Sequence, residues 1–110
     1  SLTSNISLIT AIGNDIGYED IFSKQLEMAS NKNDLLICIS ASGNSKNIIK
    51  AIKVSKKLGL NTFGLFGQGG KAEKLTHASY VVKSKDVQII EDIHTFYMHI
   101  CCKAIINEFS

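Results

Sequence analysis

The stretch that decides the fold is Leu35–Ser45, which reads LLICISASGNS. Its first five residues, Leu35–Ile39, are apolar without a break, which is typical of a strand buried on both faces of a parallel sheet. A serine-rich turn, Ser40–Ser45, follows at once. Behind it, apolar residues at helical spacing predict a helix over 45–58, and Gly59 stands where a helix C-cap glycine belongs. The stretch therefore predicts a strand–turn–helix unit.

Working outward, the same periodicities predict three further strands and three further helices. We expect strands at 6–12, 61–66 and 78–82, and helices at 18–29, 71–77 and 86–109. Strands that alternate with helices form right-handed crossovers and a parallel sheet. We therefore expect one α/β domain. Polar loops at 13–17 and 40–45 would stand at the carboxyl ends of two strands, where such sheets bind ligands.

The composition is that of a globular domain without an unusual charge pattern. Of the 110 residues, 45% are hydrophobic and 20% are charged. The net charge is +2 and the basic residues form no run, which argues against a nucleic-acid-binding stripe or a membrane-surface helix. The three cysteines show no CxxC spacing, so we expect reduced structural thiols. These features predict a cytoplasmic protein with no nucleic-acid and no membrane partner.

The turn Ser40–Ser45 has the parts of an anion site. It opens a helix, whose first backbone N–H groups lack partners within the helix and whose dipole is positive at this end. Gly43 would let the backbone approach a ligand, and Ser40, Ser42 and Ser45 offer hydroxyl donors. No lysine follows in the position of a P-loop, which favours a monophosphate over a nucleoside triphosphate. An ordinary helix cap with serine-rich turn chemistry is the alternative interpretation.

The last predicted helix carries titratable side chains on one side. At about 100° per residue, a polar stripe consists of Gln88, Asp92, Thr95 and His99. Glu91 lies beside this stripe, roughly 80° from His99. A carboxylate and an imidazole on neighbouring faces can transfer protons or share a metal ion, and a solvated helix face is the alternative. His94 points away from His99, so we expect it to be packed.

Three motifs of this chain resemble a known family. The turn Ser40–Ser45 after a buried strand is similar to the phosphate loop of sugar isomerase (SIS) domains. The segment Gly13–Ser23, GNDIGYEDIFS, resembles one typical of phosphoheptose isomerases, and so does Ile90–His94, IEDIH, followed by His99. The motifs stand in family order over nearly the whole chain. The chain is thus identified as a member of the SIS domain family, in its phosphoheptose isomerase branch.

The resemblance implies a fold, a reaction and an assembly. The fold is a three-layer α/β sandwich with a parallel sheet, of the flavodoxin-like or Rossmann-like SIS type. The reaction converts sedoheptulose 7-phosphate to D-glycero-D-manno-heptose 7-phosphate, a precursor of the heptose in bacterial lipopolysaccharide or capsule. The resemblance also implies a Zn²⁺ ion, no organic cofactor, and a homotetramer in which the long last helix packs against partner subunits.

Carried over by position, the resemblance also implies roles for individual residues. The residues that match phosphate and sugar contacts of the family are Asn14, Asp15, Ser40, Ala41, Ser42 and Ser45. His99 matches the histidine that acts as general base and zinc ligand. Glu91 stands where the family usually has Gln, at a position that contacts substrate and metal.

The chain also departs from the family pattern. It begins at Ser1 without Met. The earlier half of the family, with a first strand and a helix that bears a His and a catalytic Glu, has no counterpart in it. We therefore expect residues 1–110 to be a single SIS domain that is incomplete at its N-terminal side, without the N-terminal helices and first strand. Two other hypotheses stay open. One is a non-catalytic SIS protein that binds a phosphosugar or a replication-initiation protein, and the other is an isomerase of another phosphosugar.

Overall fold

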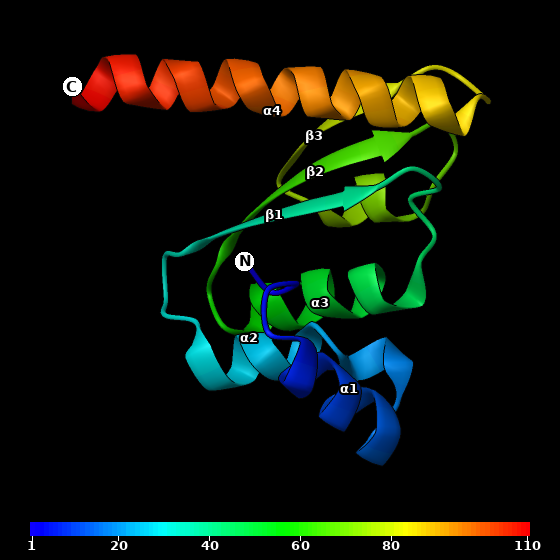
Figure 1. Ribbon diagram of the computed structural model, residues 1–110, viewed down its shortest axis with the longest axis vertical. Helices are drawn as coiled ribbons and strands as arrows, with labels where there is room; N and C mark the ends of the chain where they lie inside the picture. The colour runs from blue at the N-terminus through cyan, green and yellow to red at the C-terminus, as the bar shows by residue number, and fades with distance from the viewer.

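A parallel three-stranded sheet forms the centre of the computed structural model, which describes residues 1–110 (Figure 1). The strands are β1 (Leu35–Ser40), β2 (Asn61–Gly67) and β3 (Ala78–Val82), and they lie in the order β1-β2-β3. The predicted α/β class and the parallel sheet are confirmed, with three strands in place of the four expected.

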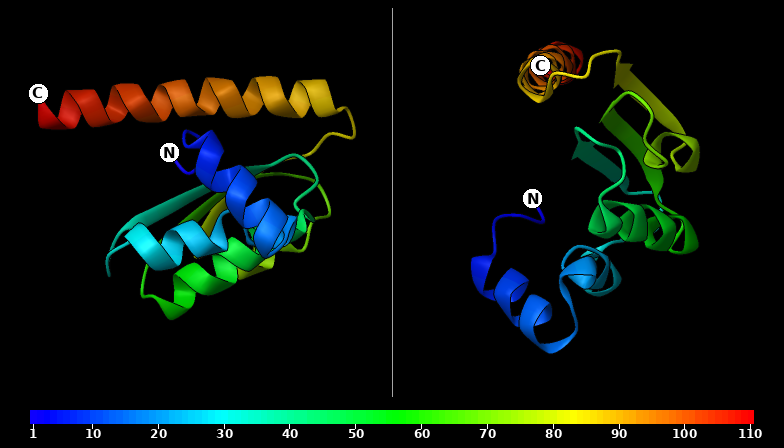
Figure 2. Two further views of the ribbon diagram at one scale, coloured as in Figure 1. Left: turned by 60° about the horizontal axis from the view of Figure 1, so that its bottom comes forward. Right: turned by 90° about the vertical axis from the view of Figure 1, so that its right-hand side faces the viewer.

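Helices on both faces of this sheet make three layers (Figure 1, Figure 2). The helix α3 (Lys46–Lys57) lies along one face, and α4 (Val87–Phe109) crosses the other. The elements on the side of α3 are α1 (Ile6–Asp15), the 3₁₀ turn η1 (Tyr18–Asp20), α2 (Ser23–Ala29) and the 3₁₀ turn η2 (Ala72–Leu75). None of the helices combines the length and the hydropathy that a bilayer-spanning segment needs.

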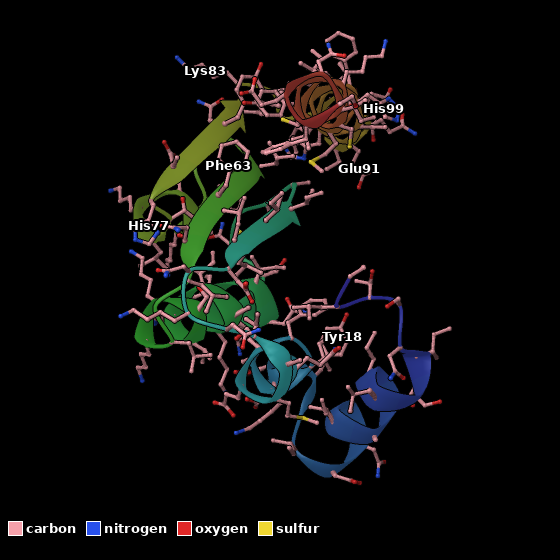
Figure 3. The ribbon with its side chains drawn as sticks, turned by 90° about the vertical axis from the view of Figure 1, so that its left-hand side faces the viewer. Tyr18, Phe63, His77, Lys83, Glu91 and His99 are labelled. Atoms are coloured by element: carbon pink, nitrogen blue, oxygen red, sulfur yellow. The ribbon has the colours of Figure 1, made fainter.

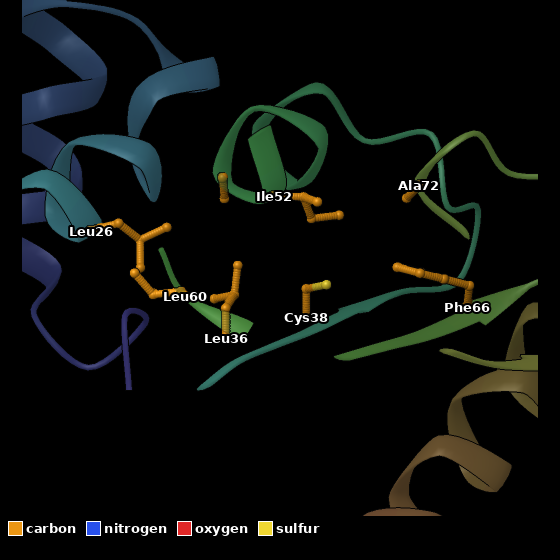
Figure 4. Close-up of a cluster of buried hydrophobic side chains, with 8 residues drawn as sticks. Leu26, Leu36, Cys38, Ile52, Leu60, Phe66 and Ala72 are labelled. Atoms are coloured by element: carbon orange, nitrogen blue, oxygen red, sulfur yellow. The ribbon is translucent and has the colours of Figure 1, made fainter. Parts of the chain in front are cut away.

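The core lies between the sheet and α3 (Figure 4). Its buried side chains are Leu26, Leu36, Cys38, Ala51, Ile52, Leu60, Phe66 and Ala72. Burial raises the pKa of the Cys38 thiol to about 11, so this thiol stays protonated at neutral pH. All three cysteines are unpaired, and Cys38 is buried whereas Cys102 is exposed.

The strand expected at 6–12 is wrong, because these residues form α1. Asn5 caps this helix, since its side-chain Oδ1 accepts a hydrogen bond from the backbone N–H of Leu8 at 3.0 Å. Ile12 is the one buried residue of α1. The apolar run ISLITAI therefore forms a helix that is mostly exposed or only partly buried. The loop expected at 13–17 is therefore the end of a helix and does not follow a strand.

The strand β1 is buried on one face only, contrary to the expectation from its apolar run. Its buried residues face α3 and are Leu36, Cys38 and Ser40. The other face is exposed by 58%, 41% and 49% at Leu35, Ile37 and Ile39. The helix α4 packs mainly over β2, and β2 is the one strand beside β1. The sheet is thus open at β1, both on its α4 side and at its edge.

The remaining helices lie close to where the sequence predicts them, although the helix expected over 71–77 is the shorter 3₁₀ turn η2. The helix α3 begins after Ser45, and Gly59 follows its last turn with φ +79, the left-handed conformation that glycine adopts most easily. The helix expected over 18–29 is present but divided, since its first turn is η1 and α2 begins at Ser23.

An ion pair ties η1 to α3. The carboxylate of Asp20 accepts hydrogen bonds from Lys50 Nζ at 2.8 Å and from Ser23 Oγ at 3.1 Å. The hydrogen bond from Lys50 is the main cause that lowers the pKa of Asp20 below its ordinary value of 3.8. A more exposed pair joins Lys46 to Glu19 at 3.4 Å. The segment after α1 is therefore fixed to the first half of α3.

We predict that Asp20→Asn removes a pH-dependent part of the stability. The pKa of Asp20 is lower in the folded chain than in the unfolded chain, so its ionised form stabilises the fold above about pH 4. This contribution is lost as the pH falls through the folded pKa. The stability difference between the parent and Asp20→Asn, measured by urea denaturation, should shrink below about pH 4. Asp92→Asn, at an exposed carboxylate without an ion pair, is the control, and an equal acid profile for both variants would contradict the prediction.

Candidate functional site

The serine turn, residues 40–45, connects β1 to α3 and is held by its own side chains. Ser40 Oγ accepts a hydrogen bond from the N–H of Gly43 at 3.1 Å, and Ser42 Oγ accepts one from the N–H of Asn44 at 3.1 Å. The hydroxyl groups of Ser40 and Ser45 lie 3.3 Å apart. The turn is thus preformed, and the hydroxyl hydrogen of Ser42 remains free to donate.

The start of α3 presents unpaired backbone donors beside this turn. Ser45 makes no capping hydrogen bond with its side chain, and the N–H groups of Ser45, Lys46 and Asn47 have no acceptor within the chain. Three free N–H groups at the positive end of a helix dipole, next to serine hydroxyls, are a suitable environment for a phosphate.

The loop after β2 fixes the serine turn from outside. The N–H of Gly67 donates to Ala41 O at 3.0 Å, and the N–H of Ala72 donates to Gly43 O at 2.9 Å. The N–H of Lys71 donates to Asn44 Oδ1 at 3.1 Å. This glycine-rich loop, residues 67–70, therefore braces the serine turn.

Gly70 and Gly43 touch through their backbones. A Cβ at Gly70 would lie 2.5 Å from Gly43 Cα and 2.6 Å from Ser42 O. Gly43 itself has φ +61, and a Cβ there would lie 2.9 Å from Gly70 Cα. The sequence predicted that Gly43 makes room for a ligand. In the structure it makes room for Gly70.

A pocket of about 500 Å³ joins the serine turn to α4. Its lining residues are Ile39, Ala41, Glu91, His94, Thr95, Met98 and His99. Ala41 belongs to the serine turn, whereas Glu91 and His99 are exposed side chains on one side of α4 (Figure 3). The structure thus brings Glu91 and His99 to one pocket with Ala41, whereas Ser40, Ser42 and Ser45 do not line it.

Glu91 and His99 offer one carboxylate and one imidazole to a metal ion. Both are ligand types that Zn²⁺ accepts, but catalytic zinc sites hold three protein ligands. No group of three or more His, Cys, Asp or Glu residues suited to a metal ion exists in the chain. These residues therefore fit part of a zinc site and require at least one ligand from outside this chain.

Asn14 and Asp15 are not brought to the pocket. They are the exposed last residues of α1, and Asn14 Nδ2 donates to Asp15 Oδ1 at 2.8 Å. Neither residue lines the pocket between the serine turn and α4.

The pocket also contains residues that the sequence did not single out as site residues. Two of them, Thr95 and Met98, could have been found, because they follow Glu91 at the i+4 and i+7 spacing of one helix face.

The fold and the site together define a class: a parallel α/β domain with a serine-rich turn at the carboxyl edge of its sheet. A family model described as SIS domain matches residues 1–67, a range that includes the whole serine turn. The chain belongs to the SIS domain family.

The similar proteins are phosphoheptose isomerases. The protein of that name from Aliarcobacter butzleri is 47% identical over the whole of this chain, and the chain covers 59% of it. The solved structure from Neisseria gonorrhoeae is 34% identical, with a TM-score of 0.91 over 94% of this chain and 60% of that one. The one from Francisella tularensis is 31% identical, with a TM-score of 0.89 over 93% and 56%. The chain thus spans less than two thirds of the length of these relatives.

We predict opposite effects of alanine at two glycines. Gly70→Ala should lower the free energy of unfolding by about 1–3 kcal/mol, because its methyl group must displace Ser42 and Gly43. Gly13→Ala should raise it by about 0.5–1 kcal/mol, since a helical alanine loses less entropy than glycine. Its methyl group would meet only Ile21 Cγ2, at 3.7 Å. Urea denaturation measures the free energy of unfolding of both variants. If Gly70→Ala were as stable as the parent, the contact between Gly70 and the serine turn would not support the fold.

Proposed function

We propose that the protein containing this chain converts sedoheptulose 7-phosphate to D-glycero-D-manno-heptose 7-phosphate, for bacterial surface heptose. One observation carries the proposal: a single pocket is lined both by Ala41 of the serine turn and by Glu91 and His99 of α4. The relatives that match the whole chain are named for this kind of isomerase. The three unpaired cysteines are suited to a reducing cytoplasm.

In this proposal the serine turn holds the phosphate. The free N–H groups of Ser45, Lys46 and Asn47 would donate to phosphate oxygens, as helix N-termini do in many proteins. The hydroxyl groups of Ser42 and Ser45 would add further donors. A charge-assisted hydrogen bond contributes about 1.5–3 kcal/mol, so a few of them give useful affinity and fix the phosphate end of the sugar.

The other end of the substrate would then lie along the pocket toward α4. An aldose and a ketose interconvert through an enediol, and a base must move a proton between C1 and C2. Histidine titrates near neutral pH, which suits a group that both accepts and returns a proton. We assign this role to His99, with Glu91 beside it in contact with the sugar hydroxyls. Asn14 and Asp15 remain proposed sugar contacts, which would require α1 to face the substrate in the complete protein.

A zinc ion is the proposed cofactor, held in part by Glu91 and His99. When bound, such an ion polarises a carbonyl oxygen and stabilises negative charge on it. The carboxylate of Glu91 gives this site more negative charge than the amide of glutamine would. Because Glu91 and His99 supply only two ligands, zinc binding in this proposal also depends on a third ligand from outside these 110 residues.

Two exposed apolar surfaces, one beside β1 and one on α4, suggest where the rest of the site and the partner subunits would pack. Beside β1 runs a groove of about 640 Å³, lined largely by apolar residues that include Phe22, Leu36 and Ile39. We propose that further chain supplies a strand next to β1, and with it the His and Glu of the complete acid–base pair. The long helix α4 exposes Phe96, Ile100 and Phe109, and we propose that these side chains pack between subunits of a homotetramer.

We predict that the full-length protein isomerises sedoheptulose 7-phosphate and that His99→Ala lowers kcat by about 10²–10⁴-fold, the usual contribution of a general base. Ser42→Ala should raise KM by roughly tenfold or more, because a donor to the phosphate is lost. Lys53→Ala, on the exposed side of α3, is the control with unchanged kinetics. Formation of the aldose is followed by a coupled assay.

Two outcomes would contradict this function. One is no turnover of the full-length protein. The other is turnover by His99→Ala equal to that of the parent. Phosphosugar binding without turnover would favour the non-catalytic SIS alternative, and turnover of a different phosphosugar would favour the third hypothesis.

We predict that His99→Ala also weakens Zn²⁺ binding by the metal-free full-length protein by more than about tenfold. Isothermal titration with zinc measures this affinity without any substrate. Asp92→Asn is the matched control, since Asp92 is exposed on the same helix but does not line the pocket. Equal affinities of His99→Ala and the parent would remove His99 from the zinc site.

A further inference from the structure

The helix α4 carries Glu91 and His99, and a short stripe of side chains fixes it to the sheet. Ile90 and His94 are buried, with 3% and 2% of their surfaces exposed. Tyr97 stacks on Tyr80 and Phe63, with ring centres 4.8 Å and 6.0 Å apart. Positions 90, 94 and 97 follow the spacing of one helix face. The rotation of α4, and with it the placement of Glu91 and His99, depends on this stripe.

His94 is the polar member of the stripe and makes one hydrogen bond. Its Nε2 lies 3.1 Å from Phe66 O, at the end of β2. A carbonyl oxygen can only accept, so Nε2 carries the hydrogen and donates it. The other ring nitrogen, Nδ1, is buried and has no partner in the chain. The chain therefore uses His94 through Nε2 alone.

The same peptide group also fixes the serine turn. Phe66 O and the N–H of Gly67 belong to one peptide bond. The oxygen accepts from His94, while the N–H donates to Ala41 O at 3.0 Å. A Cβ at Gly67 would lie 2.1 Å from Ala41 O and 2.8 Å from Ile90 Cδ1. This peptide group is thus enclosed between α4 and the serine turn. Hydrogen bonds that are linked through one peptide group strengthen one another.

We infer that His94 is a positioning residue, which acts through the Phe66–Gly67 peptide group to fix α4 relative to the serine turn. The inference rests on the proposed function. In that function, the phosphate is held at one end of this connection and the proton is transferred at the other. The distance between the serine turn and α4 decides whether C1 and C2 of the substrate reach His99. A misplacement of about 1 Å can cost a hundredfold in rate.

Two conservative variants separate this role from direct chemistry. The amide nitrogen of glutamine can occupy the place of Nε2, so His94→Gln can still donate to Phe66 O. The shorter asparagine places its amide near Nδ1 and does not reach that oxygen. We expect His94→Asn to lower kcat by roughly ten- to hundredfold, with a smaller change in KM because the phosphate donors stand on α3. His94→Gln should recover most of this loss.

The reverse order, with His94→Asn active and His94→Gln impaired, would overturn the inference, because it assigns the function to Nδ1. Equal kcat values in the two variants would overturn it as well. Inhibition by inorganic phosphate, unchanged from the parent, shows that a variant is folded around the serine turn.

A second readout needs no activity. Long-range ¹H–¹⁵N spectra of the full-length protein, labelled at histidine, report which ring nitrogen of His94 is protonated. We expect hydrogen on Nε2, and hydrogen on Nδ1 alone would overturn the inference. If the parent proved inactive, this spectrum would still decide whether His94 makes the bond to Phe66, so the failure of the proposed function and the failure of this inference are distinguishable.

Discussion

The structure depends on the close approach of two backbones where β1 and β2 end. The N–H of Gly67 donates to Ala41 O just beyond the sheet, and no side chain can fit at Gly67 without striking that oxygen. This contact extends the pairing of the two strands into the serine turn, so the turn leaves the sheet in one fixed direction. Gly70 then packs on Gly43 and completes the support. The free N–H groups of α3 are presented on a rigid turn because these glycines lie behind it.

The chain forms one side of a site and leaves the other side open. The serine turn and α4 meet at a shared pocket lined by Glu91, His94 and His99, and no group of three such residues in the chain is suited to hold a metal ion. On the same side, β1 exposes Ile37 and Ile39 and has no strand at its edge. In the proposed function, further structure would cover the exposed face of β1 and complete the ligand set of Glu91 and His99. The relatives, of which the chain covers about three fifths, are long enough to supply it.

The sequence predicted the elements whose local signals agree with their surroundings. The run Leu35–Ile39, the serine turn and α3 with Gly59 were correct, because strand propensity, turn chemistry and capping indicate the same structure. The segment 6–12 was mistaken, since a helix that buries one isoleucine shows no clear period. The apolar run of β1 suggested two buried faces, but burial depends on what covers a strand. For the site, the motifs selected the turn and the pair Glu91 and His99, and the structure places Ala41, Glu91 and His99 at one pocket. The hydrogen-bond partner of His94 could not be predicted. It is a backbone oxygen on β2, and side-chain patterns do not show which backbone groups a side chain will meet.

The proposed function requires the serine turn and α4 to bind the two ends of one phosphosugar. A crystal structure of the full-length protein with bound sedoheptulose 7-phosphate tests this most directly. We expect phosphate oxygens within hydrogen-bond distance of the N–H groups of Ser45 and Lys46, with the sugar carbons running past Ala41 toward Glu91 and His99. A phosphate bound away from the serine turn, or a sugar that leaves the turn in a direction away from α4, would show that the proposed function is wrong.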